Sequence, residues 1–343
     1  MTPAAAHGDS SVDLLTAETV GAWLQQRGLV DDGASVEATE LEWGVSNVVL
    51  AVHAAGLEVV VKQALPRLRV AEEWLAKRER TLTEADALRL AADIVPGSTP
   101  EVLAVDEDAC AMAIARAPDG WRNWKELLLA GEADPAVARR LGELLRAWQA
   151  ATLRDDDLAR RFGDIEAFDQ LRVDPYHRAV MRRWPSLAGP IGAYAEELLA
   201  TRVCLVHGDF SPKNVLVGPD SLWVIDFEVA HVGDPVFDPA FMLNHLMLKA
   251  IHRPDDADAY RACAEAFVSS YEYGLPWELV PDPELLAGHV GCLMLARVDG
   301  KSPAEYLTES QRLLARVHAT RLVTDPPATL ETAWRRLEEA LQG

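Results

Sequence analysis

The chain has 343 residues, of which 49% are hydrophobic and 25% are charged, so it can bury the core of a protein with two lobes or domains. Asp and Glu number 54 against 33 Lys and Arg, and the formal charge of −21 argues against nucleic acid or an anionic membrane surface as a partner. The same charge either attracts a cationic substrate or serves only solubility.

No targeting signal is expected at the N-terminus. Residues 1–13 lack a basic region followed by an apolar one, and no apolar run approaches the roughly 18 residues of a membrane span. We therefore expect a disordered segment at residues 1–13 and a cytoplasmic protein. The four cysteines are dispersed and form no CxxC pair, which favours reduced, buried thiols over a disulfide framework or a zinc site.

Residues 14–117 have the pattern of a small antiparallel sheet with one helix. The β-rich runs alternate and are separated by turn residues. The predicted strands are residues 36–41, 47–53, 57–62, 101–105 and 109–115. Apolar positions at helical spacing predict a helix at residues 71–92, and Pro96 and Gly97 close it. We expect these residues to form an N-terminal lobe.

Residues 118–343 are mostly helical by pattern and follow a turn signal at residues 118–120. The predicted helices are residues 124–130, 135–153, 165–184, 191–202, 237–251, 256–273, 283–298, 303–321 and 329–341. Residues 203–227 differ, because three apolar runs there are too short for helices and predict strands at 204–206, 215–217 and 222–225. The predicted fold class is α+β, with a sheet in the first lobe and a mostly helical second lobe.

The residues best suited to chemistry lie in this strand-rich segment. The run HGDFSPKN at residues 207–214 places Asp209 and Asn214 in a loop that leads into a short strand, and the next short strand ends at Asp226. Phosphoryl transfer needs a carboxylate to orient and deprotonate the attacking hydroxyl, and oxygen ligands for the magnesium ion that bridges the phosphates. The three side chains have the spacing of a kinase catalytic loop and its metal-binding aspartate.

With these motifs the sequence resembles the aminoglycoside phosphotransferase and choline kinase superfamily. The shared pattern is HGDxxxxN, a short strand that ends in Asp, and then GDPxxDxA, which is residues 233–240 here. The resemblance implies a bilobal protein-kinase-like fold, with Asp209 as the catalytic base and Asn214 and Asp226 as magnesium ligands. It also implies ATP as the phosphate donor, with GTP left open, and residues 14–117 as the nucleotide-binding lobe.

Other residues of these motifs are expected to have structural roles. His207 is expected to fix the catalytic loop through hydrogen bonds, since no serine is placed for acyl transfer. Asp234 and Asp238 are expected to brace the loop and the helix that follows them.

A lysine that contacts the nucleotide phosphates is predicted at Lys62, at the end of the third strand. Its expected partner is Glu84 on the following helix, with Glu79 as the alternative. The remaining nucleotide contacts are expected from a phosphate-covering turn with one glycine and from an adenine-binding hinge. They are Gly44, Ser46 and Asn47 in the turn, and Ala115 and Ala117 at the end of the last strand.

The predicted acceptor is a small molecule rather than a protein. Eleven residues separate Asp226 from Asp238, which is too few for a protein-kinase activation loop, and Gly208 stands where protein kinases carry an arginine. Residues 61–84 are similar to the first lobe of methylthioribose kinases, and Arg297 stands where those enzymes have the second of two paired arginines. The resemblance implies a sugar-like hydroxyl as acceptor, with Arg297 at the substrate. The alternative for Arg297 is a surface residue at a helix C-terminus.

Two other functions are weighed against this one. The first is an aminoglycoside O-phosphotransferase that confers antibiotic resistance, since residues 211–214 are closer to the antibiotic kinases. The second is a nucleotide-binding pseudokinase or scaffold, which would have no need of the full set of Lys62, Asp209, Asn214 and Asp226. The sequence indicates no particular oligomeric state.

Overall fold

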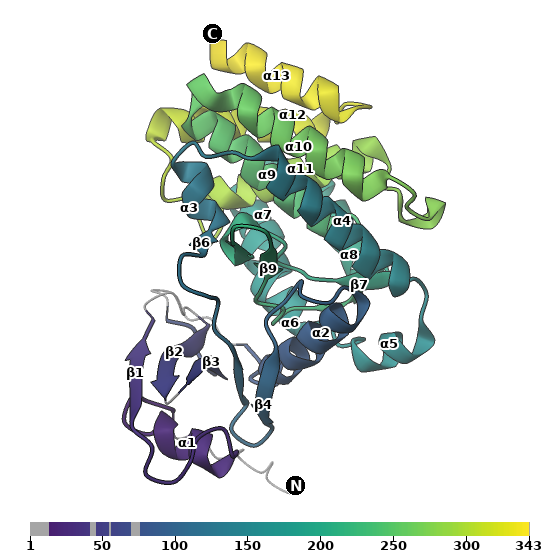
Figure 1. The fold of residues 1–343 in the computed structure, drawn as a ribbon. Coiled ribbons are helices and arrows are strands. Elements are labelled where there is room, and N and C mark those ends of the chain that lie inside the picture. Colours follow the sequence, from purple (N-terminus) through teal and green to yellow (C-terminus); the bar gives the residue numbers. More distant parts are fainter. Residues whose placement is uncertain (1–13, 42–45, 55, 70–75, 343) are drawn as a thin grey trace, which may run out of the picture. The chain divides into compact units, whose positions relative to one another are not determined.

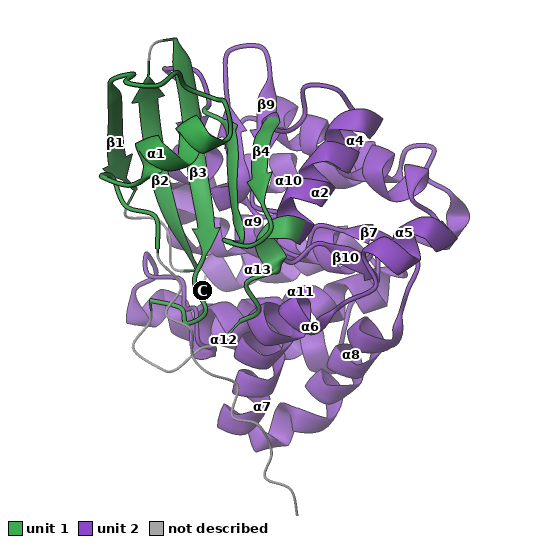
Figure 2. Cartoon of the chain, turned by 90° about the horizontal axis from the view of Figure 1, so that it is seen from below, with its two compact units in different colours: residues 1–82, 102–116 green, residues 83–101, 117–343 purple. Residues whose placement is uncertain are grey.

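The computed structural model describes residues 14–41, 46–54, 56–69 and 76–342 (Figure 1). The chain forms two compact units (Figure 2). Residues 1–82 and 102–116 make the first, here called the sheet unit, and residues 83–101 and 117–343 make the second, here called the helical unit. The chain passes from the sheet unit to the helical unit for the last time after Arg116, next to the lobe boundary expected at residue 117. Residues 83–101, which we expected in the first lobe, group with the helical unit instead.

The sheet unit is built on a five-stranded antiparallel sheet in the order β1-β2-β3-β5-β4. The strands are β1 (Val36–Glu40), β2 (Asn47–Ala54), β3 (Leu57–Ala64), β4 (Val102–Asp106) and β5 (Ala111–Ala115). All five predicted strands are therefore confirmed. A short helix that the sequence pattern did not reveal, α1 (Val20–Gln26), contributes Val20, Trp23 and Leu24 to the core beneath the sheet.

The helix after the third strand begins later than predicted. We expected it from residue 71, but residues 70–75 lie outside the described residues and α2 spans Arg80–Ile94. The turn before α2 is held by arginines, because Arg80 donates to the carbonyls of Ser46 and Leu65 and Arg78 donates to the carbonyl of Ala64. These bonds fix Arg78 and Arg80 against the start of β2 and the end of β3, where α2 begins.

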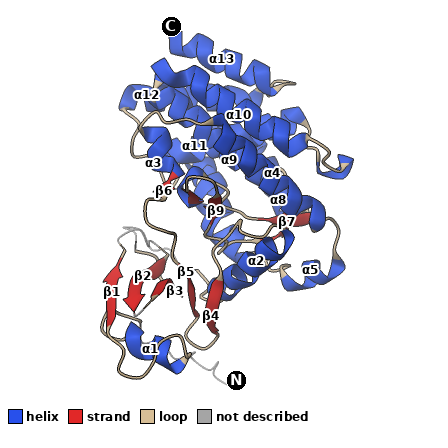
Figure 3. Cartoon of the chain, in the orientation of Figure 1, coloured by secondary structure: helices blue, strands red, loops and turns tan. Residues whose placement is uncertain are grey.

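The helical unit is a bundle of long helices (Figure 3). They are α4 (Pro135–Ala151), α8 (Ala188–Ala200), α9 (Phe237–His252), α10 (Ala257–Glu272), α11 (Pro283–Asp299), α12 (Glu309–Thr324) and α13 (Leu330–Gln342), with the shorter α3 (Trp124–Leu129) and α5 (Asp156–Arg161). Every residue of α9 from Phe237 to Ile251 is buried, as expected of a helix that is apolar on most sides. Helices α10 and α11 pack on it, and Gly142 of α4 allows the backbone of α10 to approach closely.

The predicted helix at residues 165–184 is one continuous helical segment with an irregular centre. It consists of α6 (Glu166–Phe168), a π-helix η1 (Asp169–Arg178) and α7 (Ala179–Arg183). Pro175 lies inside η1 and has no N–H to donate, which disfavours regular α-helical bonding there. The wider turns place the side chain of Arg172 in the interior.

Two small sheets interrupt the helices and carry the catalytic motifs. One pairs β7 (Cys204–Val206) with β10 (His231–Gly233), and the other has the order β6-β8-β9, with β6 (Arg122–Asn123), β8 (Val215–Val217) and β9 (Leu222–Val224). Strands β7, β8 and β9 confirm the three predicted short strands, and β6 and β10 were not predicted. In the part of the chain that the structure describes, every helix is too short or too polar to span a bilayer.

Candidate active site

Asp209 lies in the loop between β7 and β8, and its side chain is buried. Only 1% of the residue is exposed. Two cations surround its carboxylate, because Oδ2 lies 2.8 Å from Nη2 of Arg172 and 2.8 Å from Nζ of Lys213. Burial raises the pKa of the Asp209 carboxyl, but Arg172 and Lys213 outweigh it and leave this pKa below its usual value. The carboxylate is therefore ionised at neutral pH, which is the state that can accept a proton from a hydroxyl.

Asn214 is fixed at the other end of the loop, in a single 3₁₀ turn (Pro212–Asn214). Its Nδ2 donates to the carbonyl of Asp209 at 3.0 Å, so its Oδ1 is the atom suited to a metal. The backbone N–H of Ile225 donates to the carbonyl of Asn214 at 3.0 Å, and Asp226 is the next residue. Loop and strand end are thereby joined, and the predicted Asp209, Asn214 and Asp226 come together in one unit.

Asp226 has a left-handed backbone, with φ of 72°. This conformation is uncommon for a residue with a Cβ and costs on the order of 1 kcal/mol or more, so the surrounding structure must impose it. Such strain is frequent where a side chain has to be aimed at a ligand. Asp226 is also close enough for its charge to act on Asp209 and Arg172.

A magnesium ion that bridges nucleotide phosphates needs few protein ligands, because phosphate oxygens and water supply the others. Asn214 and Asp226 offer the oxygen donors that magnesium prefers, and their tethering through Ile225 suits that role. Among the described residues no cluster of three or more His, Cys, Asp or Glu side chains forms an independent metal site.

His207 uses both ring nitrogens inside the loop, as expected. Its Nδ1 accepts from the N–H of Asp209 at 3.1 Å, and its Nε2 lies 3.1 Å from the carbonyl oxygen of Ile225. The ring packs on Phe227 with 4.2 Å between ring centroids. Burial lowers the pKa of His207 to about 4, so the imidazole is neutral at pH 7 and holds the loop in place.

Gly208 and Asp238 set the backbone path of the loop. Gly208 has φ of 76°, and a Cβ there would lie 2.8 Å from Cγ2 and 2.9 Å from the carbonyl oxygen of Val229. The buried carboxylate of Asp238 accepts from the N–H groups of His207 at 2.7 Å and Gly208 at 2.9 Å. Asp234 accepts from the N–H of Val236 at 3.0 Å. The two aspartates thus brace the loop and the start of α9, as predicted.

Arg172 and Lys213 were not predicted as site residues. Arg172 is on η1, and besides Asp209 it contacts two carbonyl oxygens, from Nε to Gly208 at 2.8 Å and from Nη1 to Leu171 at 2.8 Å. Arg172 precedes Asp209 by 37 residues, so no local spacing links them. Lys213 was detectable, because it follows Asp209 by four residues within the motif.

The sheet unit holds most of the residues predicted to contact nucleotide. Lys62 is buried on β3, opposite Val49 of β2 and Met112 of β5. Asn47 begins β2, and its Nδ2 donates to the hydroxyl of Ser46 at 3.0 Å. Gly44 lies outside the described residues.

The predicted hinge and the partner of Lys62 fall at the border between units. Ala115 is the last residue of β5, and Ala117 is the first residue after the sheet unit. Glu84 is buried on α2 in the helical unit, whereas Glu79 lies in the turn before α2. Because Lys62 and Glu84 belong to different units, their pairing stays a prediction.

Arg297 lies in the last turn of α11 and is partly buried. Its Nη1 contacts the carbonyl oxygen of Ser302 and lies 2.7 Å from the Ser302 hydroxyl. The nearby Asp299 has a structural role, because Trp184 and Arg316 both donate to its carboxylate. Arg297 is therefore an anchored side chain at the end of a buried helix rather than an extended surface residue.

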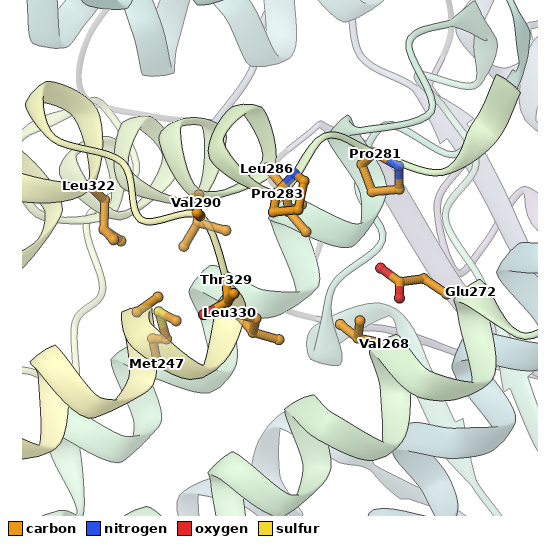
Figure 4. Close-up of a pocket in the computed structure, with 13 residues that line it drawn as sticks. Met247, Val268, Glu272, Pro281, Pro283, Leu286, Val290, Leu322, Thr329 and Leu330 are labelled. Atoms are coloured by element: carbon orange, nitrogen blue, oxygen red, sulfur yellow. The ribbon is translucent and has the colours of Figure 1, made fainter. Parts of the chain in front are cut away.

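A cavity of about 210 Å³ between α9, α10, α11, α12 and α13 is separate from these residues (Figure 4). Its lining is almost entirely apolar, with Glu272 as the one ionisable side chain, and includes no residue of the catalytic loop. We therefore assign no part of phosphoryl transfer to it.

The family to which the chain belongs is that of small-molecule kinases. The model of the APH phosphotransferase enzyme family matches residues 37–277, and the chain belongs to this family. It is thus a phosphotransferase that acts on an alcohol group.

Curated relatives include methylthioribose kinases. That of Bacillus cereus is 25% identical over 268 residues, which cover 71% of this chain and 68% of the relative. That of Geobacillus thermodenitrificans is 26% identical over 276 residues, which cover 72% of this chain and 69% of the relative.

Solved structures confirm the fold. An amicoumacin kinase in complex with AMP-PNP, Ca²⁺ and Ami superposes with a TM-score of 0.52 at 15% identity, covering 85% of this chain and 90% of that one. A choline kinase from Streptococcus pneumoniae superposes with a TM-score of 0.50 at 13% identity, covering 95% and 98%. The kinase-like bilobal fold predicted from the motifs is therefore confirmed, whereas these likenesses are too distant to identify an acceptor.

Proposed function

We propose that the chain transfers the γ-phosphate of ATP to a hydroxyl of a sugar-like acceptor, with Asp209 as the base. The observation that carries the proposal is the buried Asp209 carboxylate, which Arg172 and Lys213 keep ionised at the end of a strand. An apolar residue would fill this buried position at a lower cost in free energy. Packing alone therefore does not explain an ionised carboxylate here. The carboxylate is suited to accept the proton of an attacking hydroxyl.

In the proposed reaction the acceptor hydroxyl donates a hydrogen bond to Asp209. As the acceptor oxygen forms its bond to the γ-phosphorus, the bond between that phosphorus and the bridging oxygen of ADP breaks, and the proton moves to the Asp209 carboxylate. Asn214 and Asp226 would hold a magnesium ion, which when bound supplies positive charge to the phosphates. The bond from Ile225 to Asn214 keeps both ligands at a fixed spacing.

The sheet unit is proposed to bind the nucleotide. Lys62 would contact the phosphates, with Glu84 as its partner, and Ser46 and Asn47 would lie in the covering turn together with Gly44. The backbone around Ala115 and Ala117 would bind adenine. Use of a nucleotide with a divalent cation is supported by the amicoumacin kinase, whose complex contains AMP-PNP and Ca²⁺.

For the acceptor we favour a methylthioribose-like sugar or an amino sugar, with Arg297 in its binding site. The methylthioribose kinases among the relatives support the first choice. An aminoglycoside is the alternative. A pseudokinase is disfavoured, because the chain keeps Lys62, the proposed base Asp209 and both proposed metal ligands, Asn214 and Asp226.

The proposal is tested by ADP release with a panel of pentoses, thiopentoses, amino sugars, aminoglycosides and choline. Asp209→Asn should lower turnover by roughly 100-fold or more and leave nucleotide binding intact, because only the proton acceptor is lost. Asp220→Asn is the matched control, since Asp220 is an exposed aspartate in the turn between β8 and β9. Turnover of Asp209→Asn within a few-fold of wild type would exclude Asp209 as the base.

A further inference from the structure

Five basic side chains of the helical unit form a cluster that extends from the catalytic loop into the bundle. We call it the basic cluster. Its members are Lys125 of α3, Lys213 of the catalytic loop, His245 and Lys249 of α9, and Arg297 of α11.

A series of contacts connects the cluster to Asp209. Lys213 forms the ion pair with Asp209, and its carbonyl accepts from Nδ2 of Asn123 at 2.6 Å. Asn123 caps α3, where Lys125 is the second residue, and Nζ of Lys125 lies 2.5 Å from a carboxylate oxygen of Glu305. The basic cluster is therefore continuous with the proposed site of phosphoryl transfer.

The inner end of the cluster lies beneath residues 302–306. The ring of Tyr306 lies 5.4 Å from Nζ of Lys249, one turn of α9 beyond His245. Arg297 joins the same segment, because its guanidinium contacts Ser302 and its carbonyl accepts from the N–H of Ala304 at 2.6 Å. One short segment thus contacts three of the five basic residues.

The charges in this cluster are poorly balanced. Lys249 is only 1% exposed, yet its Nζ has no hydrogen-bond partner among the described residues, and neither does Nε of Arg297. Glu305 is the carboxylate that pairs with Lys125, but 64% of its side chain faces solvent. Asp209, at the other end, is shared between Lys213 and Arg172. At the inner end of the cluster, where Glu305 is the one described carboxylate that acts on Lys249, positive charge is therefore in excess, in a chain whose formal charge is −21.

The electrostatics of the inner residues agree with this geometry. Burial and the positive charges of Lys125 and Arg297 lower the pKa of Lys249 to about 7. Burial and four neighbouring cations, Lys213 among them, hold the pKa of His245 well below its usual value. A buried lysine without a counter-ion is costly, and a bound anion would remove that cost.

We propose that the acceptor carries an oxyanion, a carboxylate or a phosphate, which Lys249, Arg297 and Lys125 bind while its hydroxyl faces Asp209. This inference rests on the proposed function, because it takes Asp209 as the base. Among sugar-like acceptors it favours a sugar acid or a sugar phosphate, so it replaces the neutral methylthioribose-like sugar or the amino sugar that the relatives alone favour, and it disfavours a cationic aminoglycoside. The competing explanation is that Lys249 is a neutral side chain that only packs beneath Tyr306.

The first experiment compares acceptors with and without an oxyanion in a coupled ADP assay. The pairs are ribose with ribose 5-phosphate and glucose with gluconate, with kanamycin as the cationic member. We expect the phosphate or the carboxylate arm to exceed its neutral partner by about 10-fold or more in kcat/KM, as expected for hydrogen bonds to charged groups. The pair that shows this difference in kcat/KM identifies the oxyanion as a phosphate or a carboxylate.

Variants that remove either a positive or a negative side chain test which residues bind the oxyanion. Lys249→Met and Lys125→Met should each raise the KM of the anionic acceptor about 10-fold without a change in the KM of ATP, whereas Glu305→Gln should lower it. Lys125 and Glu305 are partly exposed, so these two variants keep the test valid if Lys249→Met does not fold. Arg335→Met, on α13, is the control for loss of one surface cation.

The outcomes separate this inference from the proposed function. Turnover of ribose, glucose or kanamycin that depends on Asp209 and exceeds that of the anionic acceptors would overturn the inference and leave the kinase assignment intact. If no acceptor gives ADP release that depends on Asp209, the proposed base or the choice of acceptors fails. Calorimetric titration with ribose 5-phosphate and gluconate then decides the inference alone. Binding that weakens in Lys125→Met supports it, and absence of saturable binding overturns it.

Discussion

Arg172→Met removes the guanidinium that holds the buried carboxylate of Asp209. Arg172 donates to Asp209 and to the carbonyls of Gly208 and Leu171, all at 2.8 Å. Removing one partner of a buried ion pair costs about 3–5 kcal/mol of unfolding free energy. Because Lys213 still lies 2.8 Å from the same carboxylate oxygen, we expect the lower end, about 3 kcal/mol.

Two measurements distinguish a positioning role of Arg172 from a merely structural one. Urea unfolding gives the loss of stability, and the pH profile of kcat/KM reports the ionisation of Asp209. Burial raises the pKa of Asp209 and Arg172 opposes this most strongly, so the acidic limb of the profile should move to higher pH in Arg172→Met. Arg172→Lys keeps the charge but not the three contacts, so it should lose stability while its acidic limb stays close to that of wild type.

The control is Arg178→Met on the same helical segment. Arg178 pairs with Asp169 at 2.6 Å, but both side chains are more than a third exposed, so this variant should lose about 1 kcal/mol or less. If Arg172→Met unfolds at the urea concentration of wild type and keeps the same acidic limb, Arg172 neither supports the loop nor tunes Asp209.

Three further predictions concern the loop, the buried histidines and the nucleotide. Gly208→Ala should lower both stability and kcat, because it adds a clash with Val229 to a backbone strain of about 1 kcal/mol. Gly120 has φ of 86° and no neighbour among the described residues within 4 Å of where a Cβ would lie, so Gly120→Ala should show the strain alone. Equal losses in the two variants would contradict this. Unfolding free energy should fall as pH drops from 6.5 towards 4, by up to about 1.4 kcal/mol per pH unit for each buried histidine, because the unfolded chain binds protons that the folded chain excludes. Burial lowers the pKa to about 4 in four histidines, His177, His207, His231 and His318, and to about 3 in His289. Asp238, whose pKa burial raises to about 7, opposes the trend, but its one proton is outnumbered by these five histidines and by His245, whose pKa is also held well below its usual value, so a constant urea midpoint between pH 7 and pH 5 would refute the reasoning. Lys62→Ala should raise the KM of ATP or lower kcat without changing acceptor preference, and wild-type ATP kinetics would show that another cation binds the phosphates.

The catalytic loop was predictable because its determinants are local. Strands β7 and β8 have the predicted bounds, and each is a short apolar run that ends before a polar or glycine residue, His207 and Gly218 respectively. Asp209 and Asn214 are held by bonds within the same motif. Hydrophobic period and motif spacing therefore sufficed for the loop and for the fold class.

What escaped prediction depends on contacts between distant segments. The sequence predicts a helix through residues 165–184 but not its π-helical centre, which places Arg172 against Asp209. Likewise Lys249 lies in a predicted helix, but the sequence does not reveal that its Nζ lacks a hydrogen-bond partner among the described residues, or that the ring of Tyr306, 57 residues later, lies against it. Helical periodicity reports which face is buried, and it carries no information about which segment covers that face.

The close approach of Val229 to Gly208 also limits how the activity can evolve. In protein kinases the residue at this position is an arginine that reads a phosphate on the activation loop. Here any side chain at position 208 would meet the Val229 side chain and its carbonyl oxygen within 3 Å, on a backbone that favours glycine. A single substitution cannot install such a phosphate sensor, because the segment around Val229 would have to move first. Selection can therefore adjust this kinase through its acceptor contacts far more readily than through a switch in the catalytic loop.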